Sequence, residues 1–457
     1  MKFNNKTIRT AVKEWLTESA NGRFRTSQVV KPIKTEKKYG HISKWDVSGV
    51  TDMSSLFEYG YGGFNEYIGN WDVSNVTNMS CMFKSNNSFN QDIGKWDVSN
   101  VTNMNEMFSW AKSFNQDIGN WDVSNVTTMK SMFGNTELFY QDLGNWDVSN
   151  VTDMGWMFNS VKSYTRLESD LRYLYYFNDN FDSEVWKDKS KAKEILKNAM
   201  REIEIASNLH RDDIYKHLNK LEILLKDWNQ KKMSEFYNNT PEINLKFNIG
   251  RWNVSNVTNM EAMFSKTDSF NHDIANWDVS NVTNMKLMFY YSDFNKDISN
   301  WNVSNVTDMR DMFQACPFNH DIGKWDVSNV TNMRGMFHYA HYFNQDLSNW
   351  DVSNVTDMKD MFNNAGKFNQ NLKKWKVGDD TEVSAMFDDT DSFNQDTSDW
   401  KWLNKEAAGI FIAMEKSTFY FGDDEEFEAL ELRIEFSHDG DGEHEIIDEI
   451  KEKLNCE

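Results

Sequence analysis

Residues 89–108 read FNQDIGKWDVSNVTNMNEMF, and residues 114–133 read FNQDIGNWDVSNVTTMKSMF. Tryptophan marks the same position in every such copy, at steps of 24 to 26 residues apart from one long gap. The marked positions are Trp45, Trp71, Trp96, Trp121, Trp146, Trp252, Trp277, Trp301, Trp325, Trp350, Trp375 and Trp400. A unit repeated at a fixed period is typical of an array in which each unit packs on its neighbours.

Within one repeat the spacing of apolar residues changes. Trp96 and Val98 are two residues apart, which indicates a strand with both side chains on one face. The apolar side chains of Met104–Phe108 then follow at i, i+3 and i+4, which indicates one face of a short helix. Thr102 precedes this helix and is a suitable N-cap. The repeat therefore predicts a short strand, a short helix and two turns.

The repeat also resembles a known family. The spacing Ile-x-x-Trp-x-Val-x-x-Val is similar to the pattern of leucine-rich repeats. The phrase W-D-V-S-N-V-T-x-M-x-x-M-F, with F-N-Q-D-I before it, resembles the BspA-like leucine-rich-repeat family, also catalogued as a domain of unknown function in mycoplasma surface lipoproteins. The resemblance covers roughly residues 42–158 and 247–402. It implies a repeat solenoid in a surface or adhesion-type protein. The opening repeat, KYGHISKWDVSGVTDMSSLF, is similar to versions in protists and large DNA viruses.

We therefore expect an α/β fold, a leucine-rich-repeat-like solenoid of about twelve strand-helix rungs of 24–26 residues. The expected divisions are a helical cap at 1–41, solenoid halves at 42–162 and 247–402, an inserted helical hairpin at 163–246, and a C-terminal cap with an acidic α+β tail at 403–457. The cap helix has one apolar face, formed by Ile8, Ala11, Val12, Trp15 and Leu16. The tail carries fifteen acids against three bases in residues 423–457.

The insert is a candidate docking element. Its apolar stripe includes Leu218, Leu221, Leu225 and Trp228. Every change of repeat length falls in the same turn, after the Met-x-x-Met-Phe stretch, and the insert lies there too. Solenoids gather insertions on one face, often a binding face. Either the stripe docks a partner or a second copy of the chain, or this turn merely tolerates extra chain.

Composition restricts the partners and the location. The 71 acidic and 49 basic side chains produce a net charge of -22, which disfavours nucleic acid and favours a protein with a basic surface. Three scattered cysteines predict neither a disulfide framework nor a metal cluster, and no cofactor is expected. No apolar run is long enough for a transmembrane segment, and the N-terminus has no signal-peptide core. We expect a location in the cytoplasm or within an infected host cell; the family resemblance implies the surface instead.

A column of aspartates is the candidate binding face. Since Trp and Val point inward in the expected strand, the Asp between them points outward, on the face that is concave in leucine-rich repeats. The column includes Asp72, Asp97, Asp122, Asp147, Asp278, Asp326 and Asp351. Three interpretations stay open. The carboxylates are hydrated and bonded to neighbouring side chains, they meet a cationic partner, or they hold calcium, which usually needs six to eight oxygens.

Other motifs have a simpler structural explanation. Asn-Val-Thr occurs nine times and is formally a glycosylation acceptor, but a turn asparagine and a capping threonine explain it equally. A tryptophan in the inward register of every repeat indicates core packing rather than sugar stacking. No catalytic motif stands out. We expect a non-enzymatic binding or scaffold protein that uses the solenoid face for adhesion-type protein interaction. The alternative is an enzyme or regulatory activity in the 163–246 insert or the acidic tail.

Overall fold

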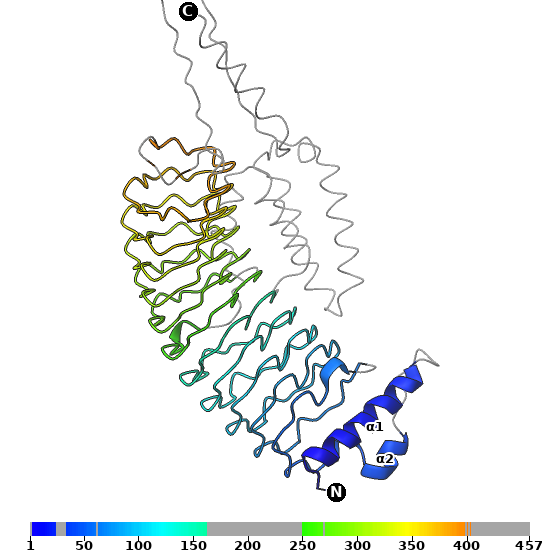
Figure 1. The fold of residues 1–457 in the computed structure, drawn as a ribbon. Helices are drawn as coiled ribbons and strands as arrows, with labels where there is room; N and C mark the ends of the chain where they lie inside the picture. The colour runs from blue at the N-terminus through cyan, green and yellow to red at the C-terminus, as the bar shows by residue number, and fades with distance from the viewer. Residues whose placement is uncertain are drawn as a thin grey trace, which may run out of the picture.

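The computed structural model describes residues 2–23, 33–60, 63–161, 249–267, 270–397, 400 and 403. In this part the repeats form coils that stack on one another along a curved array (Figure 1). We name each coil by its tryptophan. The helices of the described residues are α1 (Asn5–Arg23), α2 (Ile33–Tyr39) and the 3-10 helices η1 (Ile42–Lys44), η2 (Glu58–Gly60) and η3 (Ile249–Arg251). None of them is both long and apolar enough to cross a membrane.

Helix α1 covers the first coil. Asn4 begins it, because its Oδ1 accepts the backbone N–H groups of Lys6 and Thr7. The amphipathic helix predicted from the spacing of apolar residues is confirmed, since all five of its apolar side chains are buried. Trp15 packs edge-on against Trp45 of the first coil at 5.8 Å between ring centroids. The helix thus shields apolar side chains that the first coil would otherwise expose.

The core is a set of aromatic columns. All twelve repeat tryptophans are only 3–4% exposed, so the prediction that they point inward is confirmed. The indole of Trp121 donates from Nε1 to the carbonyl oxygen of Ile93 in the preceding coil at 3.2 Å. Phenylalanines stack beside them, with Phe83 and Phe108 of successive coils at 5.7 Å between centroids. Each coil therefore needs its neighbour both for burial and to satisfy the buried indole N–H.

Successive coils are joined by a ladder of backbone hydrogen bonds in the Met-x-x-Met-Phe stretch. Met79, Cys81, Phe83 and Ser85 donate N–H groups to the carbonyl oxygens of Asn103, Asn105, Met107 and Ser109 at 2.7–3.0 Å. In the opposite direction, the N–H of Thr102 donates to the carbonyl of Thr77 at 2.9 Å. Isolated parallel bridges at Asn78↔Asn103 and its equivalents mark the same ladder. Between successive coils the sheet-like pairing therefore follows the threonine and not the Trp-x-Val positions, where we expected a strand. The bridge Lys2↔Asp46 does involve such a position, but it joins the N-terminal residues to the first coil.

The helix expected over Met104–Phe108 is wrong. The stretch is a run of turns, in which Met107 donates its N–H to Met104 and Ser109 to Glu106. Two residues of each such run, Glu106 and Trp110 in this coil, have positive φ. A left-handed residue turns its own N–H toward the next coil, and both of these donate to it. Along this stretch the N–H groups thus donate alternately within the coil and to the next coil. Every N–H group from Met104 to Ala111 therefore has an acceptor.

The ladder continues across the long gap in the repeat. Met154, Trp156, Phe158 and Ser160 donate to carbonyls of residues 259, 261, 263 and 265 at 2.7–3.0 Å. The rings of Trp146 and Trp252 stack at 6.5 Å with an interplanar angle of 4°. The Trp146 and Trp252 coils are therefore direct neighbours, although residues 162–248 separate them in the chain.

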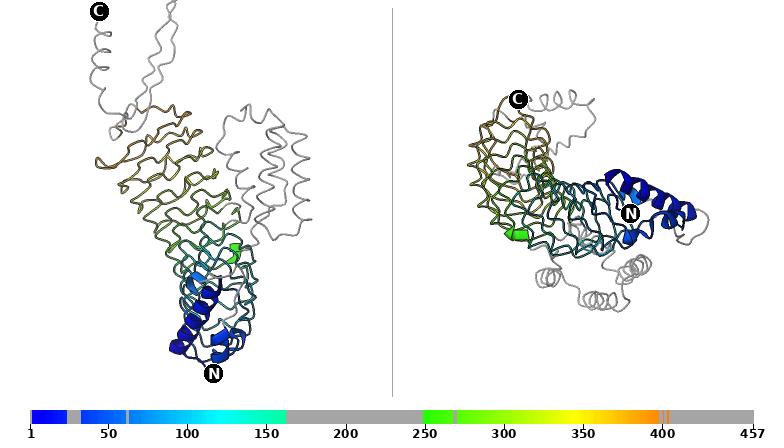
Figure 2. Two further views of the ribbon diagram at one scale, coloured as in Figure 1. Left: turned by 90° about the vertical axis from the view of Figure 1, so that its right-hand side faces the viewer. Right: turned by 90° about the horizontal axis from the view of Figure 1, so that it is seen from below.

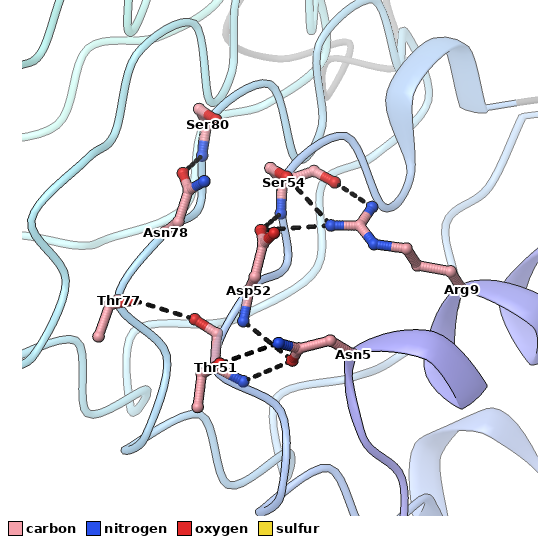
Figure 3. Close-up of polar contacts among 8 residues, drawn as sticks. All are labelled: Asn5, Arg9, Thr51, Asp52, Ser54, Thr77, Asn78 and Ser80. Carbon is pink, nitrogen blue, oxygen red and sulfur yellow. Dashed lines mark hydrogen bonds and ion pairs between the residues drawn. The ribbon is translucent and has the colours of Figure 1, made fainter.

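Two side chains of α1 complete the first coil (Figure 3). Asn5 Oδ1 accepts the N–H groups of Thr51 and Asp52 at 2.8 and 3.2 Å. Arg9 donates to the carbonyl oxygen of Ser54 at 2.6 Å and forms an ion pair with Asp52 at 3.2 Å. In later coils the preceding coil supplies these partners, as Thr77 does for Thr102. Asn5 and Arg9 therefore replace a missing coil.

The array is curved, and the two sides of each coil are spaced differently. Between the Trp45 and Trp71 coils the tryptophan rings are 6.4 Å apart but Phe57 and Phe83 only 5.6 Å. Between the Trp146 and Trp252 coils the corresponding distances are 6.5 and 5.8 Å. Consistently, η2 lies on the inner side of the curve and η3, which precedes Trp252, on the outer side (Figure 1). Figure 2 shows the bend from two other directions.

Candidate binding surface

The seven candidate aspartates are exposed, each on the Trp-x-Val part of its coil: Asp72, Asp97, Asp122, Asp147, Asp278, Asp326 and Asp351. Each accepts from the N–H of the serine two residues later at 3.0–3.2 Å, and four of them also accept that serine's hydroxyl at 2.6 Å. These serine bonds hold the pKa values of Asp122, Asp278 and Asp351 below the usual aspartate range. The carboxylate thus closes a local turn, which explains its repetition.

The expectation that this column lines the concave face needs correction. The aspartates flank the tryptophans, whose rings have the wider spacing from coil to coil. The concave side instead carries the ladder, because the phenylalanines that end it lie closer together from coil to coil. The leucine-rich-repeat analogy placed the sheet on the Trp-x-Val segment, and in this chain the pairing between successive coils lies in the next segment.

The Asn-Val-Thr motif also has structural contacts. Asn100 Nδ2 donates to the carbonyl oxygen of Ser74 in the preceding coil at 2.8 Å. The Thr102 hydroxyl donates to the carbonyl of Thr77 at 3.2 Å, so the threonine does not cap a helix as we expected. For metal binding, the described residues contain no group of three or more His, Cys, Asp or Glu side chains placed to hold an ion. The insert residues Leu218, Leu221, Leu225 and Trp228 lie outside the described part of the chain.

A different surface collects the exposed apolar side chains. We call it the exit edge: in each coil it runs from the phenylalanine that ends Met-x-x-Met-Phe to the fourth position of the following Phe-Asn-Gln-Asp. All large apolar side chains that are exposed in the described residues lie on it. They are Tyr59 (59%), Tyr67 (41%), Trp110 (47%), Leu138 (56%), Tyr140 (46%) and Tyr342 (37%). η2 belongs to this edge, on the inner side of the curve (Figure 1).

Several of the exit-edge aromatics have an unfavourable backbone conformation. In four of the described coils the second left-handed position holds an aromatic residue. These residues are Tyr59, Trp110, Tyr291 and Tyr339, with φ of 52–62°. Equivalent coils carry small or polar residues such as Ser85 and Asn135. A left-handed conformation costs a side-chain-bearing residue about 1–2 kcal/mol, and bulky residues are rare there. Strain of this kind tends to persist at functional sites.

Our sequence reasoning missed these residues, although the sequence contained a signal. It placed every change of repeat length in this turn, but as candidate residues it named only the repeated aspartates and the stripe of the insert, and the aspartates turn out to have local structural bonds. The exit edge is the part of the repeat where residues differ: Ser85, Trp110 and Asn135 occupy one equivalent position. The variation of residue type at this position agrees with the variation of repeat length, and together they indicate the surface that differs between coils.

Comparison with known proteins identifies one family. Four stretches match the model described as Mycoplasma protein of unknown function, DUF285, at residues 25–127, 93–172, 212–320 and 314–418. Together they span well over half of the 457 residues. No curated protein and no solved structure matches the chain.

Proposed function

Since the chain belongs to DUF285, a Mycoplasma family of unknown function, we propose from its surface that the protein is a non-enzymatic binding scaffold that docks another protein along the exit edge. One observation carries this proposal: every exposed large apolar side chain of the described residues lies on that edge. Aromatic side chains exposed in one region are characteristic of protein interfaces, whose central contacts are enriched in Trp and Tyr.

The partner that we propose has a basic surface. The net charge of -22 attracts cations, and the exposed aspartate column extends this field over the outer side. In this proposal the aspartates speed the diffusional encounter with the partner, and side chains of the exit edge form the contacts in the complex. Binding should therefore weaken as salt rises through physiological strength, where the screening length is about 8 Å.

We also propose that the array is a solenoid of the BspA-like leucine-rich-repeat kind. The parallel bridges between successive coils and the columns of stacked rings support it. The array differs from an α/β leucine-rich repeat in one respect, because its coils have runs of turns where that fold has helices. An array of this kind offers an edge that one partner can follow over several coils.

Site-specific crosslinking tests the proposed function. A photoreactive residue replaces Trp110 or Leu138 on the exit edge, and in matched variants it replaces Ser99 or Ser124 beside the aspartates. The full chain is then exposed to a cell extract. We expect a defined crosslinked protein from the first pair only, with a basic surface by mass-spectrometric identification. Equal labelling at all four positions, or labelling at Ser99 and Ser124 alone, contradicts the exit edge as the docking surface.

A further inference from the structure

The ladder of backbone hydrogen bonds has a direction, so its two ends need different partners. Wherever two successive coils are described, N–H groups of the Met-x-x-Met-Phe stretch donate to carbonyl oxygens of the following coil. Near the C-terminal end these donors are Met358, Asp360, Phe362 and Asn364, with bonds of 2.7–3.0 Å to residues 382, 384, 386 and 388. The first coil therefore needs donors for its carbonyls, and the last coil needs acceptors for its N–H groups.

Helix α1 satisfies the first end. Arg9 donates to the carbonyl oxygen of Ser54, where a preceding coil would supply a backbone N–H. Trp15 of the same helix packs on Trp45. Because α1 occupies this end, the last coil of a second copy cannot stack there, and head-to-tail pairing of copies is blocked.

The Trp375 coil presents the opposite end. The N–H groups equivalent to the donors of earlier coils are those of Val383, Ala385, Phe387 and Asp389, and none of them has an acceptor among the described residues. Ala385 and Asp389 keep the left-handed conformation, with φ of 53°, that turns the N–H toward a following coil. Such a row of donors is a sheet edge, which pairs readily with an extended segment.

The aromatic core at this end also has a place for one more side chain. Phe387 stacks on Phe362 of the preceding coil at 5.6 Å between centroids. In an earlier coil Phe133 covers the far side of Phe108 at 5.8 Å, but the described part of the chain has no phenylalanine in the corresponding place beyond Phe387. Phe387 is nevertheless only 3% exposed. An apolar side chain from outside the described residues would complete the column.

The chain continues at this end with a suitable segment. Trp400 is buried and lies 25 residues after Trp375, so it begins a further repeat. In a 25-residue repeat each acceptor lies 24 residues after its donor, as Asn103 does after Met79. The carbonyls of residues 407, 409, 411 and 413 are therefore the expected acceptors, and alternate carbonyls of an extended strand lie on one edge. The sequence of residues 407–413 is AAGIFIA, which has no charged residue.

We propose that residues 407–413 pair with the last coil, accept its four ladder N–H groups at their carbonyl oxygens and place Ile412 in the column of stacked phenylalanines. A strand of another protein has the same backbone groups. Residues 407–413, however, begin four residues after the buried Leu403, so their effective concentration at this edge is far higher. The inference does not depend on the proposed function, because it assigns a segment of the chain itself to the end of the array.

The test is hydrogen exchange of the full chain by mass spectrometry, followed in peptides covering residues 383–389 and, as the reference, 358–364. In wild type both peptides should be protected, at every protein concentration. Phe411→Asp combined with Ile412→Asp should speed exchange over 383–389 about tenfold or more, because a charged side chain does not enter the apolar column, and should leave 358–364 unchanged. The matched control is Ile446→Asp combined with Ile447→Asp. It changes the charge equally elsewhere in the C-terminal segment and should exchange as wild type does.

Three results overturn the proposal. Fast exchange over 383–389 in wild type would show that the edge stays open. Protection that survives the substitutions at Phe411 and Ile412 would mean that another segment supplies the acceptors. Protection that increases with protein concentration would assign the edge to a second copy. If the double variant also speeds exchange over 358–364, the array as a whole is destabilised, and Phe411→Ser, which removes the ring without adding charge, decides by the same criteria.

Discussion

Asn86 is a buried amide side chain whose polar atoms lack hydrogen bonds. It is 0% exposed, and neither its Nδ2 nor its Oδ1 has a hydrogen-bond partner among the described residues. In the Trp121 coil the equivalent position holds Thr136, whose hydroxyl donates to the carbonyl oxygen of Phe108 in the preceding coil at 2.7 Å. Thr390 makes the same bond to Phe362. The position therefore favours a small donor, and an amide there carries an uncompensated desolvation cost.

We predict that Asn86→Thr raises the free energy of unfolding by about 1–2 kcal/mol, since a satisfied hydroxyl replaces two unsatisfied amide atoms. Urea denaturation of the full chain measures this change. Asn86→Ala is the control: it removes the unsatisfied amide without adding the hydrogen bond, so it should gain less than the threonine variant. A loss of stability in Asn86→Thr would contradict the assignment.

Asp311 lies on the ladder beside Arg310 and Arg334, and burial raises its pKa to about 6 despite both guanidinium groups. Because the pKa of this carboxyl is higher in the folded than in the unfolded protein, folding favours the protonated form. The contribution of Asp311 to the free energy of unfolding is therefore fully present below the pKa of the unfolded state, and it is lost as pH rises through about 6. We predict that Asp311→Asn increases the free energy of unfolding at pH 7.5 by about 1–3 kcal/mol. The gain should shrink as pH falls from 7 to 4. Denaturation at these pH values measures it; a gain independent of pH would count against the burial argument.

At the scale of one element, α1 acts through two side chains as well as through its apolar face. We predict that Asn5→Ala speeds amide hydrogen exchange at Thr51 and Asp52, because their N–H groups lose Oδ1 as acceptor. The N–H of Thr127, bonded to the carbonyl of Thr102, is the internal reference and should not change. Asn5→Asp keeps the acceptor and should protect both amides. Equal exchange in the alanine and aspartate variants would show that the side chain does not serve this role.

The sequence predicted some elements correctly and others not. The repeat length, the inward tryptophans and the apolar face of α1 followed from spacing alone, because burial imposes a period on the chain. The Met-x-x-Met-Phe stretch was misread as a helix, since its i, i+3, i+4 spacing suits a helix and a run of tight turns equally. Glycine usually reveals a left-handed turn, but Gly335 is the only glycine among the two left-handed positions of each described coil.

The candidate site was harder to predict than the core. The aspartate column attracted attention because it repeats, yet an exposed residue repeats when a local bond requires it, as Asp97 is required by Ser99. Trp110 and Tyr339 have no such pattern, since each occurs in its own coil. Their position on the exit edge depends on left-handed turns that the sequence did not indicate.

At the scale of the whole molecule, the ladder predicts that the long insertion can be removed. Replacing residues 162–248 by Lys-Ser-Phe-Asn-Gln-Asp, copied from residues 112–117, restores a repeat of ordinary length between two coils that already bond to each other. We predict a folded array with a melting temperature within a few degrees of wild type, because coils depend on their neighbours. Circular dichroism and thermal melting measure it. Loss of the cooperative transition would mean that the insertion is part of the core.

The identical junctions between coils have a consequence for how such genes change. In each coil the carbonyl oxygens at the same positions accept N–H groups of one neighbour, and the N–H groups at the same positions donate to the other neighbour. An in-frame duplication or loss of one repeat therefore forms a junction of a kind that already exists in the array. Recombination between near-identical repeats can therefore change the number of coils without requiring new contacts between them. Each added copy lengthens the exit edge by one step of about 4.8 Å. Because α1 covers the first coil, a repeat added between two existing coils leaves that end of the array unchanged.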